Sequence, residues 1–330
     1  MKNKIALVLL VIIILSVLAG CQQRDNNSDA ATTSDITDNS SDDKLSVVAT
    51  IFPQYDFVRE IAGDSVELIM LLPPGSESHS FDPTPQDIIT IQNCDVFIYV
   101  GGESDEWVNQ ILDSMDTGNM KIISLMHLVE TVEEEVIEGM EAEEEGTDEG
   151  TEEEIEYDEH VWTSPKNAIT IVQYISEALC ELDSDNASLY TSNTTSYLKK
   201  LNELDASFQT IVDNAETHTL VFADRFPFRY FADAYGLDYY AAFPGCSSET
   251  KASAATIAFL IDKVNEENIP VVFYLELSNE KMADTICESS TAEKRLLHSC
   301  HNISKDEFES GVSYLDLMTQ NAKNLKEALQ

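Results

Sequence analysis

The chain of 330 residues is long enough to form one large domain or two medium ones. It carries 61 Asp and Glu against only 19 Lys and Arg, which gives a formal net charge of -42 at pH 7. Because so negative a chain repels phosphate groups and anionic lipids, nucleic acid is excluded as a partner and cations are favoured.

The N-terminus has the features of a secretory signal peptide at residues 1–20, with two lysines before an apolar stretch. The stretch is shorter than the roughly 20 apolar residues that cross a bilayer. It ends in LAGC, which resembles the lipobox of bacterial lipoproteins and implies that a lipid such as palmitate is attached to Cys21. Residues 21–44 lack aromatic side chains and are predicted to form a disordered tether. We therefore expect a lipid-anchored protein on the extracytoplasmic face of the cell membrane.

After residue 44, short apolar runs alternate with helical patterns, which is typical of parallel sheets flanked by helices. Ser164 and Pro165 are expected to start one helix as its N-cap and first residue. A second helix, over residues 186–217, has apolar side chains at helical spacing and no internal Pro or Gly. Strands are expected at residues 45–52, 66–72, 94–100, 121–124, 219–222, 271–275 and 311–315.

This order of elements predicts an α/β fold of two lobes. We expect an N-terminal lobe at residues 45–185, a connecting helix at 186–217 and a C-terminal lobe at 218–330. About 30 helical residues extend roughly 45 Å, which is enough to run along one lobe and into the next.

Residues 130–159 of the N-terminal lobe form an acidic loop, which has 17 Asp and Glu and no Lys, Arg or His. Self-repulsion is expected to keep this loop extended and mobile. It acts either as a solvating loop or as a weak antenna that gathers cations. It lacks the Asp and Gly pattern of a calcium-binding loop.

Besides Cys21, the chain has five cysteines, which lie in a compartment that permits disulfides. Because five is odd, at least one of them stays unpaired. Cys94 and Cys180 lie in apolar strand and helix patterns, where a buried free thiol is expected. A disulfide would join two of the other three, which are Cys246, Cys287 and Cys300.

Four of the six histidines lie in contexts typical of ligand sites. His79 lies in a loop rich in Pro and Gly after a strand, and His160 lies in a loop just before an expected helix. Loops of this kind hold ligands in open α/β sheets. A third cluster, LLHSCHN, is expected to point one of its two imidazoles inward, from His298 or His301. The remaining two lie in helical contexts and are expected to be structural: His127 and His218.

Glu276 ends an apolar strand, which places a carboxylate at the ligand edge of a sheet. Neutral imidazoles with a carboxylate suit Zn²⁺ in a tetrahedral site, whereas sites rich in carboxylates favour Mn²⁺. We therefore predict two lobes that clamp one divalent metal ion.

The sequence argues against two other functions. A lipid-anchored metallohydrolase would need a motif such as HExxH or GxSxG, and the chain has neither. An adhesin would display the acidic loop to a protein ligand, but the sequence encodes no evident patch for one. We predict a binding protein rather than an enzyme.

Five stretches resemble the zinc and manganese substrate-binding lipoproteins of bacterial ABC importers. They are the lipobox, VVATIFPQYDFVREIAGD, LLPPGSESHSFDPTPQDIITIQNCDVFIYVGG, DEHVWTSPKNA and GVSYLDLMTQNAKNLKEAL. The resemblance covers nearly all of the chain after residue 45. It implies two Rossmann-like lobes joined by a rigid helix, with His79 and His160 as metal ligands in the cleft. It also implies a monomer that delivers its metal to a membrane permease driven by an ATPase.

The C-terminal lobe departs from the family pattern. Where the family usually presents a third histidine, this chain has Asp224 and Arg225, and a guanidinium does not bind metals. The third ligand is then His301, which we favour, or His298, with Glu276 completing a zinc site. Alternatively the site relies on Asp224 and Glu276, which would favour Mn²⁺.

Two further expectations follow from the resemblance. Glu77 is a possible substitute for Glu276 as a ligand. The PGCSSET loop at residues 244–250 resembles the family's inter-lobe loop near the site, where Cys246 could approach Cys300.

Overall fold

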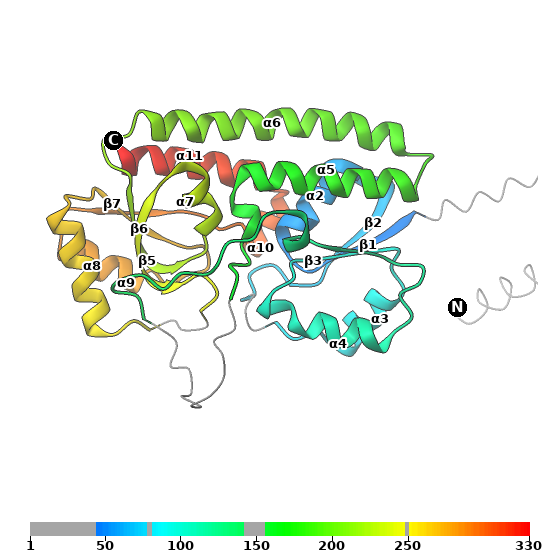
Figure 1. The fold of residues 1–330 in the computed structure, drawn as a ribbon, viewed down its shortest axis with the longest axis horizontal. Helices are drawn as coiled ribbons and strands as arrows, with labels where there is room; N and C mark the ends of the chain where they lie inside the picture. The colour runs from blue at the N-terminus through cyan, green and yellow to red at the C-terminus, as the bar shows by residue number, and fades with distance from the viewer. Residues whose placement is uncertain (1–43, 78–80, 142–155, 248–250) are drawn as a thin grey trace, which may run out of the picture. The chain divides into compact units, whose positions relative to one another are not determined.

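The computed structural model describes residues 44–77, 81–141, 156–247 and 251–330, which form two parallel four-stranded sheets flanked by helices (Figure 1). The first sheet has the order β2-β1-β3-β4, with strands β1 (Leu45–Ala49), β2 (Val66–Met70), β3 (Val96–Tyr99) and β4 (Lys121–Ser124). The second has the equivalent order β6-β5-β7-β8, with strands β5 (Thr219–Phe226), β6 (Asp238–Pro244), β7 (Val271–Tyr274) and β8 (Glu293–Leu296). The predicted α/β fold of two lobes is confirmed.

The central strands form because their side chains are apolar on both faces. Val47, Val48 and Ala49 of β1 are fully buried, and so are three consecutive residues of β3. Parallel strands covered by helices on both faces typically have continuous apolar sequences of this kind. Such runs are visible in the sequence, which is why the central strands were predictable.

Helices surround both sheets. Those before the connecting helix are α2 (Phe52–Ala62), α3 (Pro85–Gln92), α4 (Glu106–Ser114) and α5 (Pro165–Leu182), and α5 has Ser164 as its N-cap residue, as predicted. Those after it are α7 (Arg229–Tyr235), α8 (Ala254–Glu266), α9 (Lys281–Glu288), α10 (Lys305–Ser310) and α11 (Tyr314–Leu329). Four 3-10 turns are η1 (Gly63–Ser65), η2 (Glu103–Asp105), η3 (Met126–Leu128) and η4 (Val161–Thr163). Across the described ranges, every helix is too short or too polar to cross a membrane.

The connecting helix is α6 (Ala187–Asp213), whose 27 residues extend about 40 Å. Figure 1 shows it running beside both sheets, and it packs on α2 and α5 at one end and on α7 at the other. At the α7 end, the ring centroids of Phe208 and Phe231 lie 4.9 Å apart. The long helix expected between the lobes is therefore confirmed. Its buried face consists of Tyr190, Thr194, Tyr197, Leu201, Leu204, Phe208 and Val212.

The strand predicted at residues 311–315 is wrong. Gly311 ends α10 with a φ of 75°, and Ser313 is the N-cap of α11. The Asp316 amide donates to the Ser313 hydroxyl, and the Asp316 carboxylate accepts from the Ser313 amide, each at 3.1 Å. This reciprocal cap starts a helix where the apolar pattern favoured a strand. Two strands that the sequence did not predict, β6 and β8, are both edge strands of the second sheet, and β8 reads EKRL, as befits a partly solvated edge.

The expected disulfide is also wrong. Cys94, Cys180, Cys246, Cys287 and Cys300 are all free in the part of the chain that the structure describes. Cys300 is fully buried and behaves as a small apolar side chain. The suggested approach of Cys246 to Cys300 therefore forms no bond.

The acidic loop is docked at its base. Its two arms pair, since the Glu134 amide donates to the Glu156 carbonyl at 2.9 Å and the Asp158 amide donates to the Val132 carbonyl at 3.0 Å. Residues 142–155, between these arms, lie outside the described residues. The expectation of an extended, mobile loop is therefore wrong for residues 130–141, which we call the acidic strap.

The acidic strap crosses to the second lobe. The Glu134 carboxylate accepts a hydrogen bond from the Cys246 amide at 2.8 Å, and the Glu141 amide donates to the Ala242 carbonyl of β6 at 2.9 Å. The Glu141 carboxylate accepts from the Ser253 amide and the Thr256 hydroxyl at the start of α8. Hydrogen bonds from a helix N-terminus favour a carboxylate, and they offset the repulsion among the strap's own charges.

We expect Glu141→Ala to release the strap from α8, because the Ser253 amide loses its acceptor. In hydrogen–deuterium exchange, the amides of Ser253 and of residue 141 should exchange about tenfold faster, which corresponds to about 1.4 kcal/mol of lost local stability. Glu138→Ala is the matched control, since the Glu138 carboxylate makes no hydrogen bond within the described ranges. Equal exchange rates in the two variants would contradict the docking.

Candidate metal centre

A cavity of about 680 Å³ lies at the carboxyl ends of the parallel strands, and both lobes contribute to its wall. Its lining comes from the chain following β2 and from the ends of β5 to β8, where open α/β sheets hold ligands. Six of the lining residues were singled out from the sequence. Five are candidate ligands, and Arg225 stands where the family usually has a histidine: Glu77, His160, Asp224, Arg225, Glu276 and His301.

His160 is fully buried and directly precedes η4. One carboxylate oxygen of Asp158 accepts a hydrogen bond from the His160 amide at 2.8 Å and lies 3.2 Å from His160 Nδ1. Burial lowers the pKa of His160, but the neighbouring carboxylates, Asp158 first and then Glu159 and Glu134, together outweigh burial, so the pKa is raised above its ordinary value. When Nδ1–H faces Asp158, Nε2 is the nitrogen that a metal can bind.

Two glutamates near His160, Glu159 and Glu134, have structural roles. Burial raises the pKa of Glu159 to about 7, and its carboxylate accepts a hydrogen bond from the Ser104 amide at 2.7 Å. Burial likewise raises the pKa of Glu134, whose carboxylate holds the Cys246 amide. Both side chains therefore make structural hydrogen bonds.

His301 meets His160 from the opposite lobe. It lies in the loop after β8, and the two ring centroids are 5.3 Å apart with the planes at 83°. The ring of Trp162 lies 5.0 Å from that of His301 and 5.4 Å from that of His160. The Trp162 indole N–H donates to the Ser299 carbonyl at 2.8 Å, so the first lobe fixes the loop that carries His301.

Glu276 lies on the same cavity wall, just after β7. Its carboxylate accepts hydrogen bonds from the Ser299 amide at 2.8 Å and from the Ser299 hydroxyl. The Ser299 hydroxyl oxygen in turn accepts from the His301 amide at 3.2 Å. Because each carboxylate oxygen has two lone pairs, Glu276 can accept these bonds and still bind a metal.

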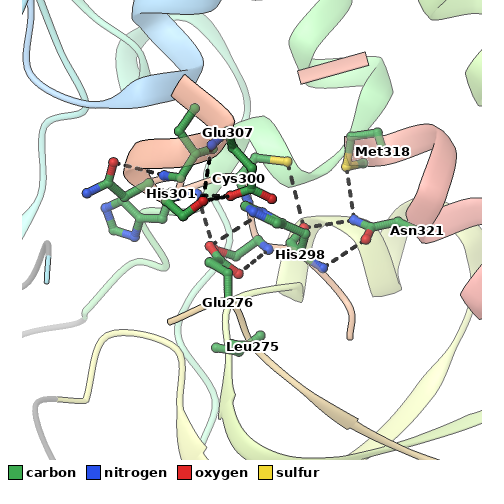
Figure 2. A network of polar contacts seen from close by, with 12 residues as sticks. Leu275, Glu276, His298, Cys300, His301, Glu307, Met318 and Asn321 are labelled. Atoms are coloured by element: carbon green, nitrogen blue, oxygen red, sulfur yellow. Dashed lines mark hydrogen bonds and ion pairs between the residues drawn. The ribbon is translucent and has the colours of Figure 1, made fainter. Parts of the chain in front are cut away.

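The ring and the backbone of His298 are both engaged in hydrogen bonds within the protein. Its Nδ1 accepts a hydrogen bond from the Cys300 amide at 2.9 Å, and its backbone is held by the Asn321 side chain (Figure 2). Neutral His298 therefore carries its proton on Nε2. To bind a metal through Nε2, His298 would have to carry its proton on Nδ1 instead. That proton would then face the N–H group of Cys300, and the hydrogen bond would be lost. His301 lines the cavity, whereas His298 does not, so His301 is the histidine of this loop that faces the cavity.

Asp224 and Arg225 are engaged in other contacts. A register shift in β5 between Phe222 and Arg225 bends the end of the strand. The Asp224 carboxylate accepts from the Arg225 amide at 2.9 Å and from the Leu275 amide at 3.4 Å. The Arg225 guanidinium donates to the Glu77 carboxylate at 3.1 Å and to a carbonyl of the following loop. Arg225 thus connects a loop of the first lobe to the second lobe. It stands at the position where the family resemblance implies a histidine.

Some predicted site residues lie outside the described residues, namely His79 and Cys21. Within the described ranges, no three His, Cys, Asp or Glu side chains converge as a metal-binding group. The structure brings together His160 and His301, with Glu276 on the same wall. His127 and His218 are exposed and do not line the cavity.

Three residues that position this centre were not predicted: Asp158, Trp162 and Ser299. The first two flank His160 in DEHVW, so a carboxylate two residues before a candidate ligand was an available signal. Ser299 gave no signal, because its role depends on contacts with Glu276 and Trp162, which lie far from it in the sequence.

Comparison with known proteins identifies the family. Residues 47–328 match the family described as "ZnuA: Zinc-uptake complex component A periplasmic". The chain is 33% identical over 302 residues to the "High-affinity zinc uptake system protein ZnuA" of Bacillus subtilis (strain 168), covering 88% of this chain and 89% of that one. It is 29% identical over 288 residues to the "Zinc-binding lipoprotein AdcA" of Streptococcus pneumoniae (strain ATCC BAA-255 / R6), covering 87% of this chain but only 56% of that relative.

Solved structures with the same fold agree with this match. The metal-dependent lipoprotein YcdH from Bacillus subtilis has a TM-score of 0.71 and 31% identity, covering 87% of this chain and 100% of that one. The Zn(II)-bound ZnuA-like domain of Streptococcus pneumoniae AdcA has a TM-score of 0.71 and 26% identity, covering 87% of this chain and 99% of that one. This chain therefore belongs to the ZnuA family of zinc-uptake complex components.

Proposed function

We propose that this protein captures Zn²⁺ outside the cytoplasm and delivers it to the permease of an ABC importer driven by an ATPase. The observation that carries the proposal is the approach of two imidazoles from opposite lobes, His160 and His301, whose ring centroids lie 5.3 Å apart at the cavity. Relatives described as zinc-uptake and zinc-binding proteins favour Zn²⁺ over Mn²⁺ as the cargo.

The proposed ligand set is three imidazoles and one carboxylate, from His79, His160, His301 and Glu276. Such a set satisfies the tetrahedral preference of Zn²⁺. Two alternatives are less favourable: His298, whose Nδ1 accepts from the Cys300 amide and which does not line the cavity, and Glu77, which pairs with Arg225. Asp224 lines the cavity and, like Glu276, accepts two hydrogen bonds, so it is the alternative carboxylate ligand.

A binding protein fits these observations better than an enzyme does. A catalytic zinc needs an open coordination position beside a general base. Here the ring of Trp162 packs against both imidazoles, and the neighbouring carboxylates hold backbone amides. The family description, an uptake component, also favours capture without bond chemistry over a lipid-anchored metallohydrolase or an adhesin.

We propose further that the protein works as a monomer anchored to the membrane. Residues 1–20 would be removed as a signal peptide, Cys21 would carry the lipid, and residues 21–44 would tether the folded body, with lobes at 45–185 and 218–330. Support comes from the LAGC sequence and from two similar proteins that are described as lipoproteins.

Removing either inter-lobe imidazole should weaken zinc binding. We expect His160→Ala and His301→Ala each to raise the Kd for Zn²⁺ by at least 100-fold, because even residues that only orient a metal ligand contribute 10- to 100-fold. A competition titration against a chromophoric chelator measures this, with circular dichroism to verify folding. His127→Ala is the control, since that exposed histidine lies away from the cavity and should leave Kd unchanged.

The same titration discriminates between the two C-lobe histidines. His298→Asn should change Kd by less than about tenfold, because the asparagine Oδ1 takes the position of Nδ1 and can still accept a hydrogen bond from the Cys300 amide. A larger loss in His298→Asn than in His301→Ala would contradict the proposed ligand set.

Lipid attachment has its own test. In cells fed radiolabelled palmitate, the wild-type chain should become labelled and Cys21→Ser should not, because no other thiol follows a lipobox. Cys287→Ser is the control and should keep the label. Unlabelled wild-type protein, or a labelled Cys21→Ser variant, would contradict the anchor.

A further inference from the structure

We propose that Arg225 is a specificity-determining residue, which favours Zn²⁺ over Mn²⁺ by keeping the Glu77 carboxylate from joining the metal ligands. The inference rests on the proposed function and names the side chain that sets its metal preference. The two residues belong to different lobes, and both line the cavity together with His160 and His301.

The loop that follows β2 is fastened beside His301. The Asn302 side chain donates to the Pro73 carbonyl at 2.9 Å and to the Ser76 carbonyl at 2.8 Å. Asn302 is only 2% exposed, so water does not compete for these hydrogen bonds. Glu77 directly follows Ser76 and lines the cavity. The structure therefore places a carboxylate of the first lobe next to the segment that carries a proposed ligand of the second.

The Arg225 guanidinium holds this carboxylate from the second lobe. Its Nη1 donates to a Glu77 oxygen at 3.1 Å and to the Ser247 carbonyl at 3.3 Å. The Arg225 side chain is only 19% exposed, and its backbone is fixed because its amide donates to the Asp224 carboxylate at 2.9 Å. The cation is thus held on the cavity wall, and Glu77 pairs with it there.

A metal ion that recruited Glu77 would break this pair. Arg225 would then keep a largely buried charge without its carboxylate, which is unfavourable. The pair therefore opposes metal binding by Glu77 and leaves Glu276 as the carboxylate beside the imidazoles of the proposed ligand set. Imidazoles suit Zn²⁺, whereas Mn²⁺ prefers sites richer in carboxylate oxygens. Withholding Glu77 thus weakens the binding of Mn²⁺ more than that of Zn²⁺.

The dissociation constants of the full chain for Zn²⁺ and for Mn²⁺ test the inference. Zn²⁺ is measured by competition with a chromophoric chelator, and Mn²⁺ by the electron paramagnetic resonance signal of the free ion. We expect Arg225→Gln to lower the ratio of the Mn²⁺ constant to the Zn²⁺ constant about tenfold, the scale on which partners of metal ligands act. The ratio is used because the loss of one positive charge affects two divalent ions equally.

The double variant Arg225→Gln plus Glu77→Gln should restore the wild-type ratio, because it releases no carboxylate. The matched control is Arg229→Gln, which removes another inter-lobe arginine. Arg229 is 22% exposed and pairs with Glu135 of the acidic strap but does not line the cavity, so the ratio should stay as in wild type. Circular dichroism verifies folding, and Arg225→Met, which keeps the length of the side chain, replaces Arg225→Gln if that variant does not fold.

Three outcomes would overturn the inference while leaving the proposed function intact. They are an unchanged ratio in Arg225→Gln, an equally low ratio in the double variant, and an equal fall in Arg229→Gln. Absence of Zn²⁺ binding by the wild-type chain, or a wild-type preference for Mn²⁺, would instead contradict the proposed function.

Discussion

The hydrogen bond from the Trp162 indole to the Ser299 carbonyl is the contact on which the metal centre depends. Trp162 is fully buried and belongs to the first lobe, whereas Ser299 lies in the loop of the second lobe that also carries His301. Ser299 in turn orients Glu276 through its amide and hydroxyl. One indole thereby aligns two candidate ligands of the second lobe with His160, its near neighbour in the sequence.

The rest of the fold holds this contact in place. The Tyr314 hydroxyl at the start of α11 donates to the Trp162 carbonyl at 2.7 Å, and the Tyr314 amide donates to Asp56 of α2 at 2.7 Å. Helix α6 runs along both lobes (Figure 1), and α11 packs on β7 and β8 of the second lobe and on α2 of the first. The acidic strap adds a further crossing near the cavity. The two lobes are therefore fastened to each other at several places.

The sequence predicted the features whose causes are local. The apolar runs of β1 and β3, the Ser164–Pro165 start of α5 and the long helix α6 follow from patterns within short windows. His160 was identifiable because it precedes a capped helix. The choice between His298 and His301 was not settled by spacing, because it depends on Cys300, whose φ of 62° turns its amide onto His298 Nδ1. The docked strap was missed because its partners lie far along the chain: the Glu141 carboxylate accepts from the Ser253 amide at the start of α8, and the Glu141 amide donates to the Ala242 carbonyl of β6.

The central claim is that zinc is held by imidazoles from both lobes. X-ray absorption at the zinc edge of the zinc-loaded chain tests this most directly. The account predicts nitrogen and oxygen donors at about 2.0 to 2.2 Å, with scattering from at least two imidazoles. It also predicts that one imidazole is lost in His301→Ala. A sulfur donor at about 2.3 Å, from Cys246 or Cys300, or an unchanged imidazole count in His301→Ala, would contradict it.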